Sequence, residues 1–270
     1  MIVLRSEHDI QKMRQAGLLV WHGLQIAASM ARPGVKTIEI DRRIECFFVE
    51  HDAEPLFKGH PGRVPFPATI CASVNDEVVH GIPGDRILRE GDILSVDTGC
   101  RFDGWCGDSA LTFAIGRVAA ETQKLLDVTS RTLQIAIEFI PKCKKWSQVA
   151  QKMEDYVRKN DFYVVETLVG HGIGREMHED PQVPNYVSPE LLKHYDFELQ
   201  RGVVIAVEPM VNIGTKRVRV GKDHWTLSTA DKSLSAHFEH TLAITEKGLK
   251  VLTAPPENDS EKVDLSAYCN

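Results

Sequence analysis

Four acidic residues of this chain lie inside segments that are otherwise apolar and rich in strand-forming residues. A carboxylate buried in such a segment destabilises the fold unless it is paired, protonated or bound to a cation. Four of them in comparable settings therefore indicate a site at which acidic side chains do chemistry. They are Asp97 in residues 93–99, Asp108 in 105–115, Glu208 in 203–211 and Glu239 in 234–245.

Asp97 and Asp108 flank a turn-like tetrapeptide, Arg101–Gly104, which predicts an antiparallel hairpin. A turn centred between Phe102 and Asp103 would pair Asp97 directly with Asp108, with Cβ atoms about 5 Å apart on one face. Like charges placed in this way repel, and either a divalent cation or a shared proton would offset the repulsion. Two alternatives would leave the pair without a function. The register could be shifted by one residue, or both aspartates could be solvated at the surface.

His171 is the one nitrogen donor that we group with these acids. It lies between Gly170 and Gly172, and glycines let the backbone come close to a site. A lone histidine is more often structural than a ligand. Together with four carboxylates, however, it makes a donor set that suits Mn, Fe, Co or Zn in a two-metal site with ions about 3.5–4 Å apart. No cysteine belongs to the set, which argues against a structural zinc site.

The elements that must position these residues occur twice along the chain. Helical spacing predicts helices over residues 7–31, 37–51, 120–139 and 146–160, with Pro33-Gly34 and Pro141 separating the members of each pair. Strand-like segments follow each pair, at 68–74, 93–99 and 105–115, and again at 162–169, 203–211 and 234–245. The halves, about residues 5–116 and 117–250, share this order but negligible sequence identity, which indicates an architectural duplication. We expect one catalytic domain over residues 1–254 and a loose tail over 255–270.

Composition excludes several other classes of protein. Of the 270 residues, 43% are hydrophobic and 26% charged, as in ordinary soluble globular proteins. A net charge of -6 without a long run of Lys or Arg argues against bulk binding of nucleic acid. The six cysteines are scattered, which predicts reduced thiols in an intracellular protein. The N-terminus lacks the residue order of a signal peptide, and the longest uncharged stretch, residues 15–31, is too polar and short to span a membrane.

Seven phrases, spread over a match from about residue 5 to 250, together resemble the methionine aminopeptidases in their shorter, type I form. Only 29 residues separate His178 from Glu208, which fits type I and leaves no room for the large insertion of type II enzymes. The chain begins almost directly at the catalytic domain, without the zinc-finger extension of some type I relatives. The phrases are Val78–Pro83, Ser95–Gly99, Gly107–Ala110, Gly170–Gly174, Met177–Pro181, Val207–Pro209 and Ser233–Thr241.

The resemblance implies a fold and a metal centre. The fold is the α+β pita-bread (creatinase/aminopeptidase) fold, two pseudo-symmetric halves with antiparallel sheet, helices outside and the metals between them. Two divalent ions per chain are implied, of Co, Mn, Fe, Zn or Ni. Residues matching Asp108 and Glu239 bridge both ions, that matching Asp97 holds one, and those matching His171 and Glu208 hold the other. A monovalent cation near Asn75 and the backbone of Ser235 is also implied.

The resemblance implies a methionyl aminopeptidase, a hydrolase of class 3.4.11. Such an enzyme removes the N-terminal methionine of nascent proteins when the second residue is small, by metal-activated attack of water on the first peptide bond. Glu208 resembles the family's proton shuttle. His178 would support the oxyanion or carbonyl, and His80 the substrate backbone or leaving amide. The implied methionine pocket has walls from Phe66, Cys71, Met177 and Trp225, with plain core packing as the alternative for all four.

The implied setting is a monomeric cytoplasmic enzyme that acts on nascent chains with an initiator methionine, at the ribosome surface, without membrane contact or direct nucleic-acid readout. The chain departs from the family at Met177, where Phe is usual, at His237, where Gln is common, and in the unusual loop Gly59–Pro65. Two rival functions remain. Xaa-Pro peptidases use the same five ligand types but are usually longer, and non-enzymatic binding proteins on this fold tend to lose ligands, whereas all five are present here.

Overall fold

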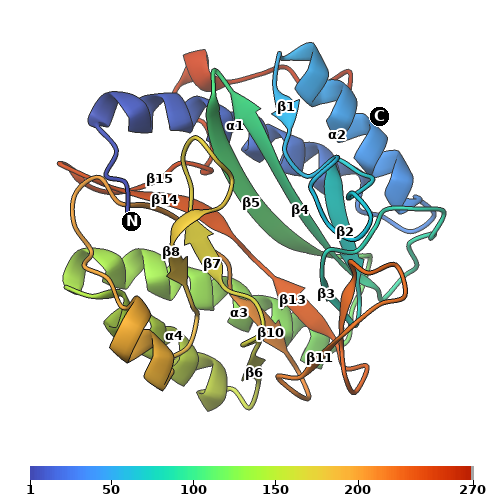
Figure 1. Cartoon of the computed structure of the whole chain (residues 1–270). Coiled ribbons are helices and arrows are strands. Elements are labelled where there is room, and N and C mark those ends of the chain that lie inside the picture. The colour runs from blue at the N-terminus through green and yellow to red at the C-terminus, as the bar shows by residue number, and fades with distance from the viewer. Residues whose placement is uncertain (269–270) are drawn as a thin grey trace.

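The structure is a computed structural model that describes residues 1–268 (Figure 1). Its four long helices are α1 (Glu7–Met30), α2 (Thr37–Glu50), α3 (Ala120–Phe139) and α4 (Trp146–Lys159). All four predicted helices are confirmed to within one residue at each end. Ser6 begins α1 through a capping box with Asp9, which satisfies the free N–H groups of the first turn. The pairs α1–α2 and α3–α4 lie on opposite sides of the strands (Figure 1).

Every strand pairing among the described residues is antiparallel. One sheet has the order β1-β4-β2, with β5 also paired to β4, and another the order β15-β14-β9-β7-β8. Two smaller sheets have the orders β13-β10-β6 and β11-β12-β3. The strands are β1 (Glu54–Pro55), β2 (Ile70–Val74), β3 (Glu77–Val79), β4 (Ile93–Phe102), β5 (Trp105–Ala114), β6 (Tyr163–Val164), β7 (Gly170–Gly172), β8 (Glu179–Val183), β9 (Val204–Val207), β10 (Met210–Asn212), β11 (Val218–Val220), β12 (Leu227–Thr229), β13 (Ser235–His237), β14 (His240–Thr245) and β15 (Gly248–Val251).

The β4–β5 hairpin forms as predicted, but the predicted register is wrong. Asp97 pairs with Ala110, and Asp108 pairs with Gly99, so the two acids are diagonal neighbours. The turn is centred on Asp103-Gly104, both with positive φ, because a two-residue hairpin turn that follows the sheet twist needs this geometry. The difference amounts to two positions along the partner strand. Because side chains alternate with a period of two, both carboxylates still lie on one face.

The second half carries its acids at strand ends and not inside continuous strands. The predicted segment 203–211 divides into β9 and β10 at Glu208-Pro209, since proline has no N–H for the ladder. The segment 234–245 divides into β13 and β14 at Phe238-Glu239. The segment 162–169 was predicted as one strand, and only Tyr163–Val164 is one. These breaks let the chain turn each glutamate inward.

A seam of hydrogen bonds joins the two halves along β5. The amide of Glu239 donates to the carbonyl of Ala110 at 2.9 Å, and the Thr241 hydroxyl donates to the carbonyl of Asp108 at 2.8 Å. Further along, the Ser109 hydroxyl donates to the carbonyl of Glu239 at 2.5 Å. Residues 108–112 and 237–241 therefore run side by side, and the seam sets Asp108 beside Glu239.

Each helix pair covers its own apolar core. One core lies between α1, α2 and the strands β2 and β4, and includes Leu24, Phe47 and Val96. The other lies between α3, α4 and the strands β9 and β14, and includes Trp146 and Leu242. Burial of these side chains stabilises each half by about 25 cal/mol for each Å² of apolar surface removed from water.

The C-terminal segment is ordered against the helices, contrary to the expectation of a loose tail. The buried Arg14 guanidinium of α1 bonds the carbonyls of Ala254 and Pro255 and pairs with Glu261 at 2.9 Å. Tyr268 is buried against Phe47, and its hydroxyl bonds Glu50. A polar, proline-rich composition did not reveal these anchors. The boundary at residue 254 stays a prediction.

Among the described residues, no helix combines the length and apolar character that crossing a membrane requires. Cys46, Cys71, Cys100, Cys106 and Cys143 are free in the structure. Cys269 lies outside the described residues.

We predict that Gly107→Ala destabilises the fold, because α1 packs directly on β5 at this point. A Cβ on Gly107 would lie 2.8 Å from the amide nitrogen of Gly17. The nearest atoms all belong to the backbone of α1, so the helix itself would have to shift. Overpacking of this kind costs about 1–3 kcal/mol. Urea unfolding measures the loss. Gly84→Ala is the matched control, since nothing lies within 4 Å of its added Cβ. Equal stability of the two variants would contradict this packing.

Candidate metal centre and substrate pocket

The five predicted metal ligands converge on one cavity of about 230 Å³. The predicted pocket residues Phe66, Cys71, Met177 and Trp225 line the same cavity, as do His80 and His178. The structure therefore brings together every candidate site residue from both halves. The remaining lining residues are Phe57, His60, Leu168 and Val169, which sequence reasoning did not select.

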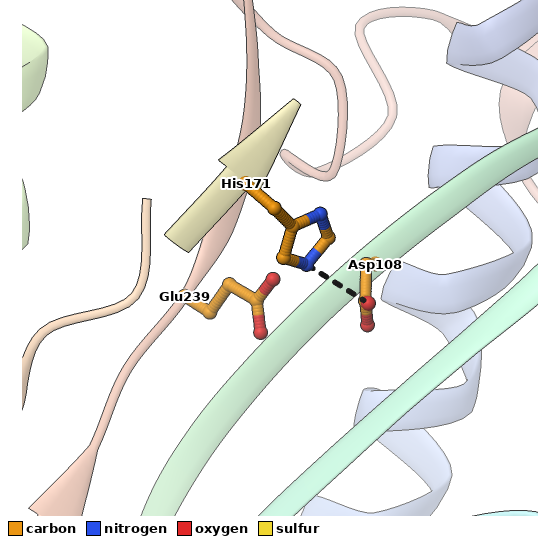
Figure 2. A group of neighbouring side chains, drawn as sticks. All are labelled: Asp108, His171 and Glu239. Atoms are coloured by element: carbon orange, nitrogen blue, oxygen red, sulfur yellow. Dashed lines mark ion pairs between the residues drawn. The ribbon is translucent and has the colours of Figure 1, made fainter. Parts of the chain in front are cut away.

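Asp108, His171 and Glu239 form the tightest part of the centre, shown in Figure 2. Their ligand atoms all lie within 4.8 Å of one another. Nε2 of His171 is 3.9 Å from Oδ2 of Asp108 and 3.8 Å from Oε1 of Glu208. These separations are too long for hydrogen bonds. They suit donors that share an ion, because bonds of about 2.0–2.2 Å place two ligands roughly 3–4 Å apart.

The backbone around His171 fixes which ring nitrogen faces the acids. Nδ1 lies 2.9 Å from the carbonyl of Gly172, an acceptor only, so this nitrogen carries the proton. The lone pair of Nε2 is then directed at Asp108 and Glu208, as metal binding requires. Close packing of β7 explains the flanking glycines, since a Cβ on Gly172 would lie 2.0 Å from the carbonyl of Asp180.

Burial and mutual repulsion dominate the electrostatics of the acids. Burial first, and then the charges of the neighbouring acids, raise the pKa values of Asp97, Glu208 and Glu239 well above their ordinary range. Burial raises the pKa of Asp108 to about 7, although its hydrogen bonds act in the opposite direction. Burial and the neighbouring His178 lower the pKa of His171 to about 4. Without a cation, this cluster holds protons to reduce its charge.

Unpartnered buried oxygens test whether the residues fit a metal. Oδ1 of Asp97, Oδ1 of Asp108 and Oε1 of Glu239 are buried and have no hydrogen-bond partner. Buried polar atoms are almost always satisfied, and a cation bound between these three carboxylates would satisfy their oxygens. Oxygen donors with one imidazole suit divalent first-row metals. The donor set therefore fits divalent metal ions.

The rest of the cavity is apolar. Phe57, Phe66, Cys71 and Met177 form one buried cluster, with Trp225 packed against it. The rings of Phe66 and Trp225 meet edge to face at 5.3 Å, and Nε1 of Trp225 donates to the carbonyl of Val64 at 2.7 Å. A cavity with acids at one end and this wall at the other fits a flexible apolar side chain that carries a charged amine.

Three further histidines, His60, His80 and His178, line the cavity. The ring of His178 lies 4.4 Å from that of His171 and 5.6 Å from that of His60. His80 has a positive φ of 58°, and burial and the neighbouring histidines lower its pKa to about 4. His178 also has a lowered pKa, from partial burial and from His60. An imidazole that is neutral near pH 7 still carries one N–H group. This group can donate a hydrogen bond to a developing oxyanion.

His237 lies beside the acids but does not belong to the predicted set. Its Nε2 is 3.9 Å from Oε2 of both Glu208 and Glu239, and both its ring nitrogens are buried without a hydrogen-bond partner. Its backbone is held by Thr112 on β5. His237 ends β13 and Glu239 lies in the break before β14, so strand alternation alone did not place the two on the same side.

The side chain of Asn75 is engaged by protein groups. Its amide donates to Asp92 at 2.8 Å and its oxygen accepts from the amide of Ile93 at 3.0 Å. The amide of Ser235 donates to the Asn75 carbonyl at 2.9 Å. Asn75 and Ser235 are thus neighbours, and a monovalent cation at this place stays a prediction.

Comparisons with known proteins agree with this geometry. The model of metallopeptidase family M24 matches residues 11–246. A curated methionine aminopeptidase of Clostridium acetobutylicum is 43% identical over 254 residues, which cover 94% of this chain and 99% of that protein. A crystal structure of a Thermotoga maritima methionine aminopeptidase has a TM-score of 0.89 at 38% identity, covering 94% of this chain and all of the other.

More distant structures share the fold alone. A Xaa-Pro dipeptidase from Bacillus anthracis has a TM-score of 0.71 at 18% identity, and the match covers 94% of this chain but 63% of that one. These neighbours and the observed elements confirm the predicted pita-bread fold, with its two related halves.

We predict that Asp108→Asn stabilises the metal-free protein at pH 8 and removes part of its pH dependence. The folded-state pKa is raised from 3.8 to about 7, so between these values the folded protein binds more protons than the unfolded chain. Stability from this group is present at low pH and lost as pH rises through 7. Below about pH 6.5, buried histidines with lowered pKa values oppose the trend, so pH 6.5–8 isolates the carboxyls of the cluster, and the comparison with Asp108→Asn gives the share of Asp108.

The measurement is urea unfolding in chelator between pH 6.5 and 8. We expect the free energy of unfolding to rise by on the order of 2 kcal/mol at pH 8. A shift of one pKa unit corresponds to about 1.4 kcal/mol, and the gain is smaller than the whole shift would give because the acids share protons. Calorimetry should also show weaker divalent metal binding by Asp108→Asn. Asp155→Asn, at an exposed position on α4, is the control. Unchanged metal affinity in Asp108→Asn would remove this residue from the centre.

Proposed function

The chain belongs to the methionine aminopeptidases of metallopeptidase family M24, and we propose that it removes the N-terminal methionine from nascent proteins whose second residue is small. One observation supports the proposal: the five side chains that we assign to metal binding and an apolar wall meet in a single cavity. Its relatives cover it nearly end to end, so the match concerns the whole catalytic unit.

We propose that Asp97, Asp108, His171, Glu208 and Glu239 together hold two divalent ions, of Co, Mn, Fe, Zn or Ni, with Asp108 and Glu239 as the shared ligands. The central place of these two, linked by the seam between the halves, supports the assignment. When bound, such ions lower the pKa of water and polarise a carbonyl group, so that a nucleophile exists near neutral pH.

We assign the proton transfer to Glu208. Its carboxyl borders the cavity, and burial with the nearby charge of Asp108 raises its pKa. A carboxylate with a raised pKa accepts a proton from water more readily and can pass it to the leaving amine. The backbone of Glu208 is held by Asn185, whose amide donates to the Glu208 carbonyl at 3.1 Å. This contact and Pro209 keep the carboxyl facing the cavity.

The remaining polar residues orient the substrate. His178 donates to the charge that develops on the carbonyl oxygen, and His80 contacts the substrate backbone or the leaving amide. Phe66, Cys71, Met177 and Trp225 enclose the methionine side chain, and Met177 gives the wall a flexible thioether in place of a rigid ring. The setting that we propose is a cytoplasmic monomer that meets nascent chains at the ribosome surface.

The first test of this function is substrate choice. The purified protein, supplied separately with Mn, Fe, Co, Zn or Ni, should cleave Met-Ala-Ser and leave Ala-Pro peptides intact. The reason is the deep apolar cavity next to the acids, which a first-residue Ala would not fill. Release of the first residue is measured by chromatography. Preferential cleavage of Ala-Pro would favour a Xaa-Pro peptidase, and metal binding without any cleavage would favour a binding protein.

The second test separates chemistry from metal binding. His178→Ala should lower kcat by about 10²–10³, the usual effect of removing a donor to a developing oxyanion. Metal affinity measured by calorimetry should change little, and KM should move less than kcat, because the contact strengthens in the transition state. A loss of metal with normal kcat at saturating metal would make His178 a ligand, and no change in either would make it structural.

A further inference from the structure

A second cavity, of about 470 Å³, adjoins the metal cavity on the side of His178. His60, Met177 and His178 line both cavities, so these three side chains form the partition between them. The outer cavity is otherwise bounded by residues 54–56, 58, 59 and 61, and by Arg101 and Glu176. Its continuity with the catalytic cavity makes it a candidate site for part of the same substrate.

The partition is held firmly on the His60 side. The loop of residues 59–66 is closed at its base, where the amide of Gly59 donates to the carbonyl of Phe66 at 2.8 Å and the amide of Phe66 to that of His60 at 3.0 Å. Trp225 fastens the loop tip through the carbonyl of Val64. His60 is therefore presented at a fixed place, with its ring edge-on to His178.

We propose that the outer cavity binds the substrate residues that follow the second one, so that the enzyme reads an extended peptide of about five residues. The inference rests on the proposed function, in which methionine fills the inner cavity and the bond to be cleaved lies beside His178. The rest of the chain must then leave past His178, and the outer cavity begins at this residue. At about 3.3 Å per residue, three further extended residues span roughly 10 Å.

The outer wall of this cavity is charged. Arg101 pairs with Glu54 at 3.3 Å and with Glu176 at 3.1 Å, joining strand β1 to the segment that carries Met177 and His178. Two exposed carboxylates share this one guanidinium, and Lys58, which also lines the cavity, pairs with Glu45. The charges of the lining therefore balance, and a charge change at Glu176 alters the preference between a basic and an acidic side chain at the substrate position that reaches it.

Charge reversal at Glu176 tests the proposal through the ratio of kcat/KM for two peptides. Partial unfolding lowers both values equally and leaves this ratio unchanged. For the metal-loaded enzyme, kcat/KM is compared between five-residue Met-Ala peptides that carry Lys or Glu at position three, four or five. Glu176→Lys should shift the Lys-to-Glu ratio toward Glu by about three- to tenfold at one of these positions. Added salt should reduce the shift. Glu190→Lys, an equal charge change at an exposed position outside both cavities, is the control. An unmoved ratio at all three positions overturns the proposal.

A second measurement locates the peptide without relying on turnover. A Met-Ala peptide with a photoreactive benzophenone side chain at position four is irradiated with the protein, and the adduct is mapped by mass spectrometry. We expect adducts in residues 54–61 and 176–178, and adducts elsewhere would overturn the assignment. Failure of the outer site and failure of the proposed function give different results. Cleavage of the dipeptide Met-Ala with no effect of peptide length or charge rejects the outer site alone, whereas no cleavage of any Met-Ala substrate rejects the proposed function.

Discussion

The hydrogen-bonded seam between β5 and residues 237–241 is the contact on which the rest of the structure depends. It is built from the amide of Glu239, the hydroxyls of Ser109 and Thr241, and the paired groups of Thr112 and His237. The seam joins two halves that each have their own apolar core. It also sets Asp108 beside Glu239, so the cohesion of the fold and the existence of the acidic centre have one origin.

The same arrangement concentrates repulsion where the chemistry is proposed. Four carboxyls with raised pKa values and three unpartnered oxygens lie in a small volume, which destabilises the metal-free fold. A divalent cation that bound only the folded state would offset this repulsion and stabilise the protein by mass action. Strong sheet pairing along β4 and β5 keeps the acids in place in its absence. Stability and metal affinity are thus coupled through the same side chains.

The substrate side of the cavity is built from different elements than the acidic side. Its walls come from loops and strand ends, as is common for binding residues carried by a rigid scaffold. Met177 and His60 lie in these walls, and His237 faces the acids from the seam itself. Changes in the loop walls would alter which peptides fit, while the acids and the seam would stay as they are.

The sequence by itself determined the helices, the apolar segments that carry the acids and the side of the hairpin on which Asp97 and Asp108 lie. These features depend on local periodicity and on the two-residue alternation of a strand, which survives a register error of two positions. The register at Asp103-Gly104 and the strand break at Glu208-Pro209 have local causes, because an Asp-Gly pair favours a two-residue turn and proline has no N–H for the ladder. Only the tertiary structure decided the strand break at Glu239, the anchoring of residues 255–268, and the places of His60 and His237. Each of these depends on contacts between residues far apart in the chain, and local sequence patterns carry no record of such pairings.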